Sequence, residues 1–114
     1  MRLKKARQML KSFADDTRLR IVNLLSRKEL SVSELCEIIG STQPNVSKHL
    51  ARLRLTGIVG DRRNGNSVYY RLSKPADKAR RGLINAVTSG LSELETFRMD
   101  RKRLNSLKER KRNV

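Results

Sequence analysis

Apolar residues recur every three or four positions along the first quarter of the chain, which predicts two amphipathic helices. The apolar side of the first helix is formed by Leu3, Ala6, Met9, Leu10 and Phe13. Asp15 has the character of an N-cap for the second helix, because its carboxylate can accept a hydrogen bond from the first turn. The inner side of the second helix is expected at Leu19, Val22 and Leu25.

A third helix is predicted from a capping box. Ser31 and Glu34 have the spacing at which the serine hydroxyl accepts from the N–H of Glu34 while the glutamate side chain reaches back to the N-cap backbone. The apolar stripe of this helix consists of Val32, Leu35, Cys36 and Ile39. Gly40 is expected to end the helix, since glycine readily takes the left-handed conformation of a C-cap.

A fourth helix follows within a few residues, so the pair predicts a helix-turn-helix. It is expected to begin at Ser41 or Thr42, with Pro44 in its first turn, where a missing N–H costs little. Its buried side is predicted at Val46, Leu50 and Leu53, and its end at Gly57.

The pattern then changes to alternation, which predicts a β-hairpin. Residues 58–63 and 67–72 are the expected strands, and Asn64-Gly65-Asn66 joins them. An Asn-Gly pair supplies the positive φ angles of a tight hairpin turn. One strand alternates between two faces, with Val68, Tyr70 and Leu72 on one and Tyr69 and Arg71 on the other. Beside a helix-turn-helix, such a hairpin is a wing.

A long helical segment is predicted after Pro75, with an apolar seam and Phe97 close to it. The seam consists of Leu83, Val87, Leu91 and Leu94. Residues 98–114 are dense in Arg and Lys, so two alternatives stay open here, an extension of the helix and a disordered tail. We divide the chain into residues 1–74, which hold the predicted helix-turn-helix and wing, and residues 75–114, a C-terminal helix with a basic tail.

Charge narrows the class of partner. The 114 residues suffice for one domain, and they carry a formal net charge of +16. This much positive charge repels itself, which is most easily understood if the partner is a polyanion. Nucleic acid is the first candidate, an anionic membrane surface is the second, and a charge that serves solubility alone is the third. The chain has no apolar run of transmembrane length, no signal-peptide core and a single cysteine, so we expect a cytoplasmic protein.

The outward side of the fourth helix and the hairpin tip hold the candidate DNA contacts. Small and polar side chains there allow the helix to enter the major groove. The candidates on the helix are Gln43, Asn45, Ser47, Lys48, His49 and Arg52. Those on the wing are Arg62, Arg63, Asn64 and Asn66. For His49 a structural role is the alternative to a phosphate contact. Leu55 also points outward, and the pattern gives no reason for it.

From about Phe13 to Leu72 the chain resembles the ArsR/SmtB family of dimeric winged-helix repressors. The matching segments are FADDTRLRIVNLL, ELSVSELCEII, STQPNVSKHLARL and RRNGNSVYYRL. The resemblance implies a mainly α fold with a small β-hairpin, a winged helix-turn-helix dimerised through the first and last helices. It also implies a homodimeric, sequence-specific DNA-binding transcriptional regulator, a repressor that binds an inverted-repeat operator in double-stranded DNA.

The same resemblance bears on metal sensing. Many sensors of this family carry a Cys-x-Cys at the start of the third helix, and those positions correspond here to Ser31 and Ser33. A neutral hydroxyl is a poor ligand for soft metals. The family's other site uses histidines of the last helix, whereas the one histidine here is His49. We therefore expect no metal and no cofactor. Cys36 is expected in the core, with a thiol switch through an intersubunit disulfide as the alternative.

Two other functions remain alternatives. An architectural protein that binds duplex DNA with little sequence preference would suit the charge, but it would not need a recognition helix. An RNA-binding winged helix is disfavoured because exposed aromatics for base stacking are scarce. No catalytic constellation is present, so we do not expect an enzyme. For the release of DNA, a ligand at the dimer interface, a thiol switch and constitutive binding all stay open.

Overall fold

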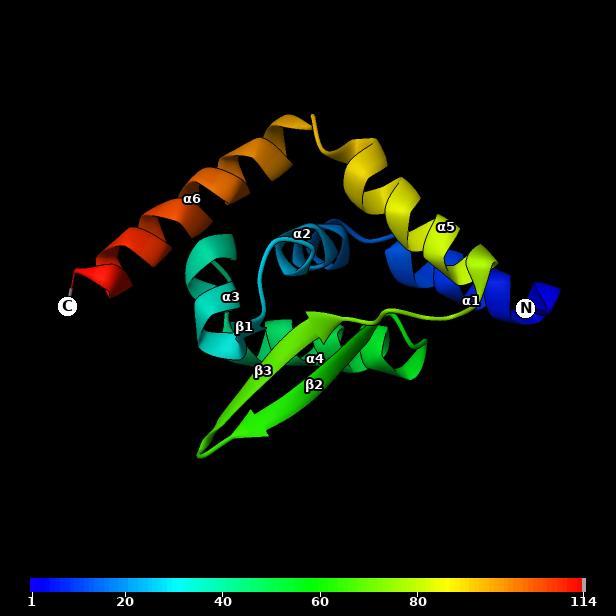
Figure 1. Cartoon of the computed structure of the whole chain (residues 1–114), viewed down its shortest axis with the longest axis horizontal. Helices are drawn as coiled ribbons and strands as arrows, with labels where there is room; N and C mark the ends of the chain where they lie inside the picture. Colours follow the sequence, from blue (N-terminus) through cyan, green and yellow to red (C-terminus); the bar gives the residue numbers. More distant parts are fainter. Residues whose placement is uncertain (114) are drawn as a thin grey trace.

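Helix α2 (Asp16–Leu25) lies at the centre of the molecule in the computed structural model, which describes residues 1–113 (Figure 1). The predicted N-cap is confirmed, because Asp15 accepts a hydrogen bond of 3.0 Å from the backbone N–H of Arg18. Residues 21–25 are all buried, so α2 is buried on more than the one side that its pattern predicted. Helix α1 (Leu3–Phe13) precedes it and buries Met9 and Phe13.

Helices α3 (Val32–Ile39) and α4 (Gln43–Leu55) form the predicted helix-turn-helix. The capping box of α3 is confirmed, with the N–H of Ser31 donating to Glu34 Oε1 at 2.9 Å and the N–H of Glu34 donating to Ser31 Oγ at 3.2 Å. Gly40 ends α3 with a φ of 76°, a left-handed conformation that favours glycine. Thr42 caps α4 by accepting from the N–H of Asn45.

The wing consists of β2 (Val59–Asn64) and β3 (Ser67–Leu72), which pair antiparallel. The expected Asn-Gly turn needs a correction, because Asn64 belongs to β2 and pairs with Ser67. Gly65 therefore takes the first central position of a two-residue turn, with a φ of 65°, while Asn66 has no positive φ. This combination is the type II′ turn, in which glycine is favoured at the first position.

A third strand, β1 (Leu30–Ser31), was not predicted. It pairs antiparallel with β3, Leu30 opposite Tyr70 and Ser31 opposite Tyr69, so the sheet order is β1-β3-β2. Two residues are too short for an alternating pattern, and Ser31 already had a role as the α3 cap. The strand fixes the start of α3 to the base of the wing.

The prediction of one long helix after Pro75 is wrong. The structure divides this segment into α5 (Lys78–Thr88), a short 3₁₀ turn η1 (Ser89–Leu91) and α6 (Glu95–Arg112). Thr, Ser and Gly at the break have low helix propensity. The Thr88 hydroxyl also donates to the Ile84 carbonyl at 2.8 Å, which competes with regular helix geometry.

Helix α6 then turns back over α2 and α3 (Figure 1). Of the two alternatives for residues 98–114, the structure supports the helix, which runs to Arg112; Val114 lies outside the described residues. Leu104 and Leu107 are buried and join the same core cluster as Leu35 and Leu50. Within residues 1–113, no helix combines the length and the apolar character needed to cross a membrane.

Candidate nucleic-acid interface

Helix α4 has two chemically distinct sides. Val46, Leu50 and Leu53 are completely buried, which confirms the predicted inner side. The outer side carries small and polar residues together with one leucine. Its exposed members are Gln43, Pro44, Ser47, Lys48, Ala51, Arg52, Arg54 and Leu55. Apart from Leu55, the exposed side chains of this surface are either small or long and flexible, so the helix can approach another macromolecule closely.

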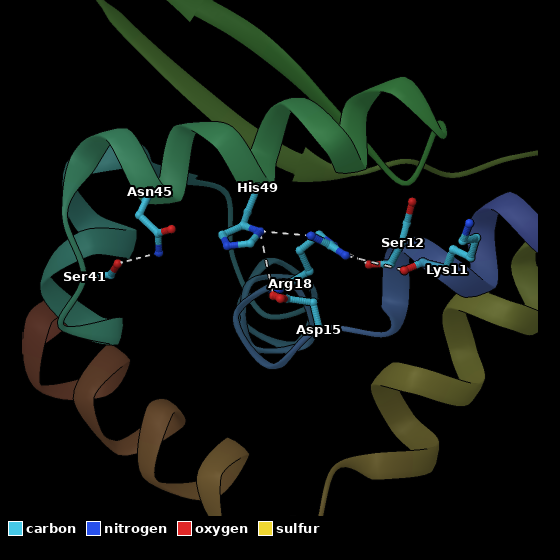
Figure 2. Close-up of polar contacts among 7 residues, drawn as sticks. All are labelled: Lys11, Ser12, Asp15, Arg18, Ser41, Asn45 and His49. Atoms are coloured by element: carbon cyan, nitrogen blue, oxygen red, sulfur yellow. Dashed lines mark hydrogen bonds and ion pairs between the residues drawn. The ribbon is translucent and has the colours of Figure 1, made fainter.

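Four of the six candidates on α4 are exposed: Gln43, Ser47, Lys48 and Arg52. Asn45 is half-buried, and its amide Nδ2 donates a hydrogen bond of 2.9 Å to Ser41 Oγ (Figure 2). That bond orients the amide along the turn between α3 and α4. The bond therefore leaves only part of the Asn45 side chain accessible to a binding partner.

His49 does not belong to the exposed surface, and of its two predicted roles the structure supports the structural one. It follows Val46 by three residues, so the helix turns its side chain inward, where 11% of it is exposed. Its Nδ1 lies 3.1 Å from Nη1 of Arg18 and 3.7 Å from Oδ2 of Asp15 (Figure 2). Burial lowers the pKa of His49, with Arg18 and Lys48 acting in the same direction and Asp15 opposing them.

The wing presents Arg62, Arg63, Asn64 and Asn66 to solvent. Arg62 already has two neighbours. Its Nε donates to Glu29 Oε2 at 2.7 Å, and its guanidinium lies over the ring of Tyr69, 5.1 Å from the centroid. Glu29 follows α2 in the sequence, so sequence reasoning had no signal for this pair. The ion pair with Glu29 partly neutralises Arg62, and the contact with the Tyr69 ring holds the guanidinium against β3.

Leu55, whose exposure the sequence pattern did not explain, lines a hollow between α4 and β3. The hollow is lined by Ser47, Ala51, Arg54, Leu55 and Tyr70. Leu55 is 82% exposed on this surface. Arg54 connects the helix to the wing through Nη1, which lies 3.0 Å from Asp61 Oδ2. The helix and the hairpin therefore present one joint surface.

The residues that correspond to a Cys-x-Cys site have other environments. Ser31 is engaged in the capping box, and Ser33 is exposed. Cys36 is a free, half-buried thiol that packs against the core, and burial raises its pKa. A raised pKa keeps the thiol protonated and less reactive. Among the described residues, no group of three or more His, Cys, Asp or Glu side chains is arranged to hold a metal ion.

The chain is similar to known bacterial regulatory proteins. Residues 15–60 match the family described as "Bacterial regulatory protein, arsR family". The arsenical resistance operon repressor of Escherichia coli is 51% identical over 67 residues, which cover 58% of this chain and 57% of that protein. The arsenic resistance transcriptional regulator ArsR1 of Pseudomonas putida is 43% identical over 89 residues, which cover 74% of this chain and 70% of the relative.

Solved structures agree with the fold. The transcriptional repressor BigR of Xylella fastidiosa superposes with a TM-score of 0.68 at 37% identity, covering 81% of this chain and 88% of that one. A homodimeric winged helix-turn-helix DNA-binding domain from Mycobacterium bovis gives a TM-score of 0.66 at 28% identity, covering 80% and 82%. The fold is thus a winged helix-turn-helix, and the chain belongs to the ArsR family of bacterial DNA-binding transcriptional regulators.

Proposed function

We propose that the protein is a homodimeric repressor that recognises an inverted-repeat operator with α4 and contacts the flanking phosphates with its wing. The observation that carries this proposal is the division of α4 into a completely buried apolar side and an exposed side of small and polar residues. A helix that packs on the core with one side and exposes small and polar side chains on the other can enter the major groove.

The exposed side chains suggest a division of roles. Lys48 and Gln43 are long enough to reach base edges, and both offer hydrogen-bond donors. Ser47 and Ala51 leave room for close approach. Arg52 and the wing residues Arg62 and Arg63 suit the phosphate backbone, where guanidinium groups bind in a fork. Asn64 and Asn66 stand at the wing tip beside them.

The dimer is proposed from apolar side chains left exposed on the first helix and the C-terminal segment. Leu3 and Leu10 of α1 are 82% and 54% exposed, and Leu94 and Met99 are also exposed. The Mycobacterium bovis domain is a homodimer. We therefore propose that residues 1–74 form the DNA-binding domain and residues 75–114 the dimerisation segment, and that α1 also contributes to the dimer interface. Two copies of α4 would occupy half-sites about 34 Å, or one helical turn, apart.

We further propose that this repressor lacks the Cys-x-Cys metal site of its family. Ser31 and Ser33 stand at those positions, and Ser31 is held in the capping box. The names of the relatives support transcriptional repression, since the Escherichia coli and Xylella fastidiosa proteins are both repressors. The inducing signal would then be something other than a metal bound at the start of α3.

Selection of bound sequences from a pool of random duplexes tests the proposal. The expected product is an inverted repeat with half-sites about one helical turn apart, bound by two protein chains in light scattering. Enrichment of no sequence at all would contradict specific recognition. A single half-site bound by one chain would contradict the dimer and leave the role of α4 intact.

An architectural DNA-binding role is the second candidate, and the exposed basic residues of α6 favour it. The exposed group comprises Arg98, Lys102, Arg103, Arg110, Lys111 and Arg112. Such a surface attracts phosphates regardless of sequence. Competition between the selected duplex and random duplex at moderate salt separates the two functions. Equal competition would favour the architectural role.

A further inference from the structure

We propose that Arg18 is a positioning residue for DNA recognition, which ties the C-terminal end of α1 to His49 in α4 and so sets the orientation of the base-reading side. This inference rests on the proposed function, because it assumes that α4 reads the operator. It adds a residue of α2 that lies outside the exposed DNA-facing surface.

The contacts of Arg18 join three helices at one guanidinium (Figure 2). Its Nε donates to the carbonyl oxygen of Ser12 at 2.7 Å, and its Nη1 lies 3.1 Å from Nδ1 of His49. A longer contact of 3.5 Å runs from Nη2 to the carbonyl oxygen of Lys11. The last carbonyls of a helix lack partners within the helix, so Arg18 satisfies the end of α1 while it holds α4.

His49 is well placed to transmit this contact. Its side chain is buried beneath α4, while its sequence neighbour Lys48 is exposed on the outer side. A helix moves nearly as a rigid body, so a shift of His49 also moves Lys48. Because α1 is proposed to form part of the dimer interface, the guanidinium connects that interface directly to α4.

The contact requires one particular state of His49. An arginine guanidinium only donates hydrogen bonds, so Nδ1 of His49 must accept and the imidazole proton must sit on Nε2. A second proton on Nδ1 would face the Arg18 donor and turn toward Asp15 Oδ2, 3.7 Å away. The charged groups around the ring are Asp15 and Arg18 from the start of α2 and Lys48 from α4. Helix α1 contributes backbone carbonyls here.

Burial lowers the pKa of His49, which keeps the ring neutral near pH 7. His49 is the only histidine in the sequence, so a change of DNA recognition between pH 7.5 and 5 reports mainly on this ring. A proton also adds positive charge, which by itself favours any duplex. The informative quantity is therefore the ratio of the affinities for the selected duplex and for random duplex.

Three variants of the full-length protein test the inference. Arg18→Lys keeps the charge but cannot reach Ser12 and His49 at once. Arg20→Lys is the matched control. Arg20 is also a half-buried arginine of α2, but its guanidinium binds Asp100 of α6 and not His49. His49→Asn keeps an acceptor close to the Nδ1 position and cannot take up a proton.

For Arg18→Lys we expect the affinity ratio to fall about tenfold, as for loss of a hydrogen bond to a charged group. Arg20→Lys should leave the ratio within about twofold even where it lowers the melting temperature. The ratio of the wild type should fall as pH is lowered from 7.5 to 5, while that of His49→Asn should stay flat. Nitrogen chemical shifts of the imidazole should show the proton on Nε2 in the wild type at pH 7.5.

Several results would overturn the inference while leaving α4 as the reading helix. These are an unchanged ratio in Arg18→Lys, an equal loss in Arg20→Lys, and the same pH dependence in His49→Asn as in the wild type. If Arg18→Lys does not fold, the pH profiles of the wild type and His49→Asn decide. A wild type that prefers no duplex at any pH would instead contradict the proposed function, and this inference with it.

Discussion

Arg20 of α2 and Asp100 of α6 form a two-pronged ion pair across the interior of the molecule. Nε of Arg20 lies 2.8 Å from Oδ2 of Asp100, and Nη2 lies 2.8 Å from Oδ1. The Asp100 side chain is completely buried, and Nη1 of Arg103 lies 3.2 Å from its Oδ1. The pair therefore fixes α6 against the central helix.

Removal of Arg20 should strongly destabilise the fold. In Arg20→Ala the buried Asp100 keeps Arg103 as its one basic partner among the described residues, and because the Arg103 side chain is 50% exposed, the charge of Asp100 is poorly compensated. We expect the free energy of unfolding to fall by about 3 kcal/mol, as for other broken buried pairs. Urea unfolding measures this change. Arg103→Ala is the control and should cost under about 1 kcal/mol; equal losses in the two variants would contradict a leading role for Arg20.

Lys48→Ala should reduce sequence preference more than general DNA affinity. Lys48 is exposed on the outer side of α4, where a lost base contact typically costs about tenfold in discrimination. Filter binding with the selected and the random duplex measures both affinities. Lys102→Ala removes the same charge from α6 and should weaken both duplexes alike. A parallel loss for both duplexes in Lys48→Ala would mean that Lys48 contacts phosphate and not bases.

Glu29→Gln should increase affinity for every duplex. Glu29 binds Arg62 at 2.7 Å, so the neutral amide leaves more of the guanidinium charge for phosphate. We expect a rise of about threefold and a salt dependence steeper by about one counterion. Glu93→Gln, which removes an acidic residue between η1 and α6, controls for net charge. An equal rise in both variants would show that Arg62 does not contact DNA.

Glu34 should make the fold sensitive to acid. Burial by itself would raise the pKa of Glu34, but hydrogen bonds from Lys111 and from the N–H of Ser31 outweigh it and lower the pKa below the ordinary 4.5. A carboxylate with a lowered pKa in the folded state stabilises the protein above pH 4.5, and this contribution is lost as pH falls through the folded-state value.

Chemical unfolding between pH 3 and 7 tests this expectation. The difference in unfolding free energy between the wild type and Glu34→Gln should be largest at pH 7 and should shrink below pH 4.5. Lys111→Ala should remove part of it, about 0.5 kcal/mol, because Lys111 is 56% exposed. Arg110→Ala, which removes the exposed partner of Glu37, should leave the pH profile unchanged. A pH-independent difference would contradict the role given to Glu34.

Local chemistry explains why much of the fold was predictable. Capping by Asp15 and Ser31 and the left-handed Gly40 act within a few residues, so their sequence signals are complete. The apolar side of α4 was equally clear from its period. The break between α5 and α6 was missed because the apolar seam continues across it and suggested one continuous helix. The low helix propensity of Ser89 and Gly90 favours an interruption at this point.

The missed parts of the site depend on contacts between distant segments. Glu29 and Arg62 lie 33 positions apart, and Arg18 and His49 lie 31 apart. A single sequence gives no signal for such pairs. His49 shows the limit most clearly, because the sequence left a structural role and a phosphate contact open, and the partner that gives it a structural role comes from another helix.

The serines at the start of α3 should leave the protein without tight binding of soft metals there. Neutral hydroxyls are weak ligands, and the Ser31 hydroxyl already accepts the N–H of Glu34 at 3.2 Å. Calorimetry with cadmium or arsenite should therefore show no stoichiometric uptake. The double variant Ser31→Cys with Ser33→Cys tests the position itself and should gain uptake, at the cost of part of the capping box. Tight uptake by the natural chain that persists in Cys36→Ser would place the ligands elsewhere and contradict this account.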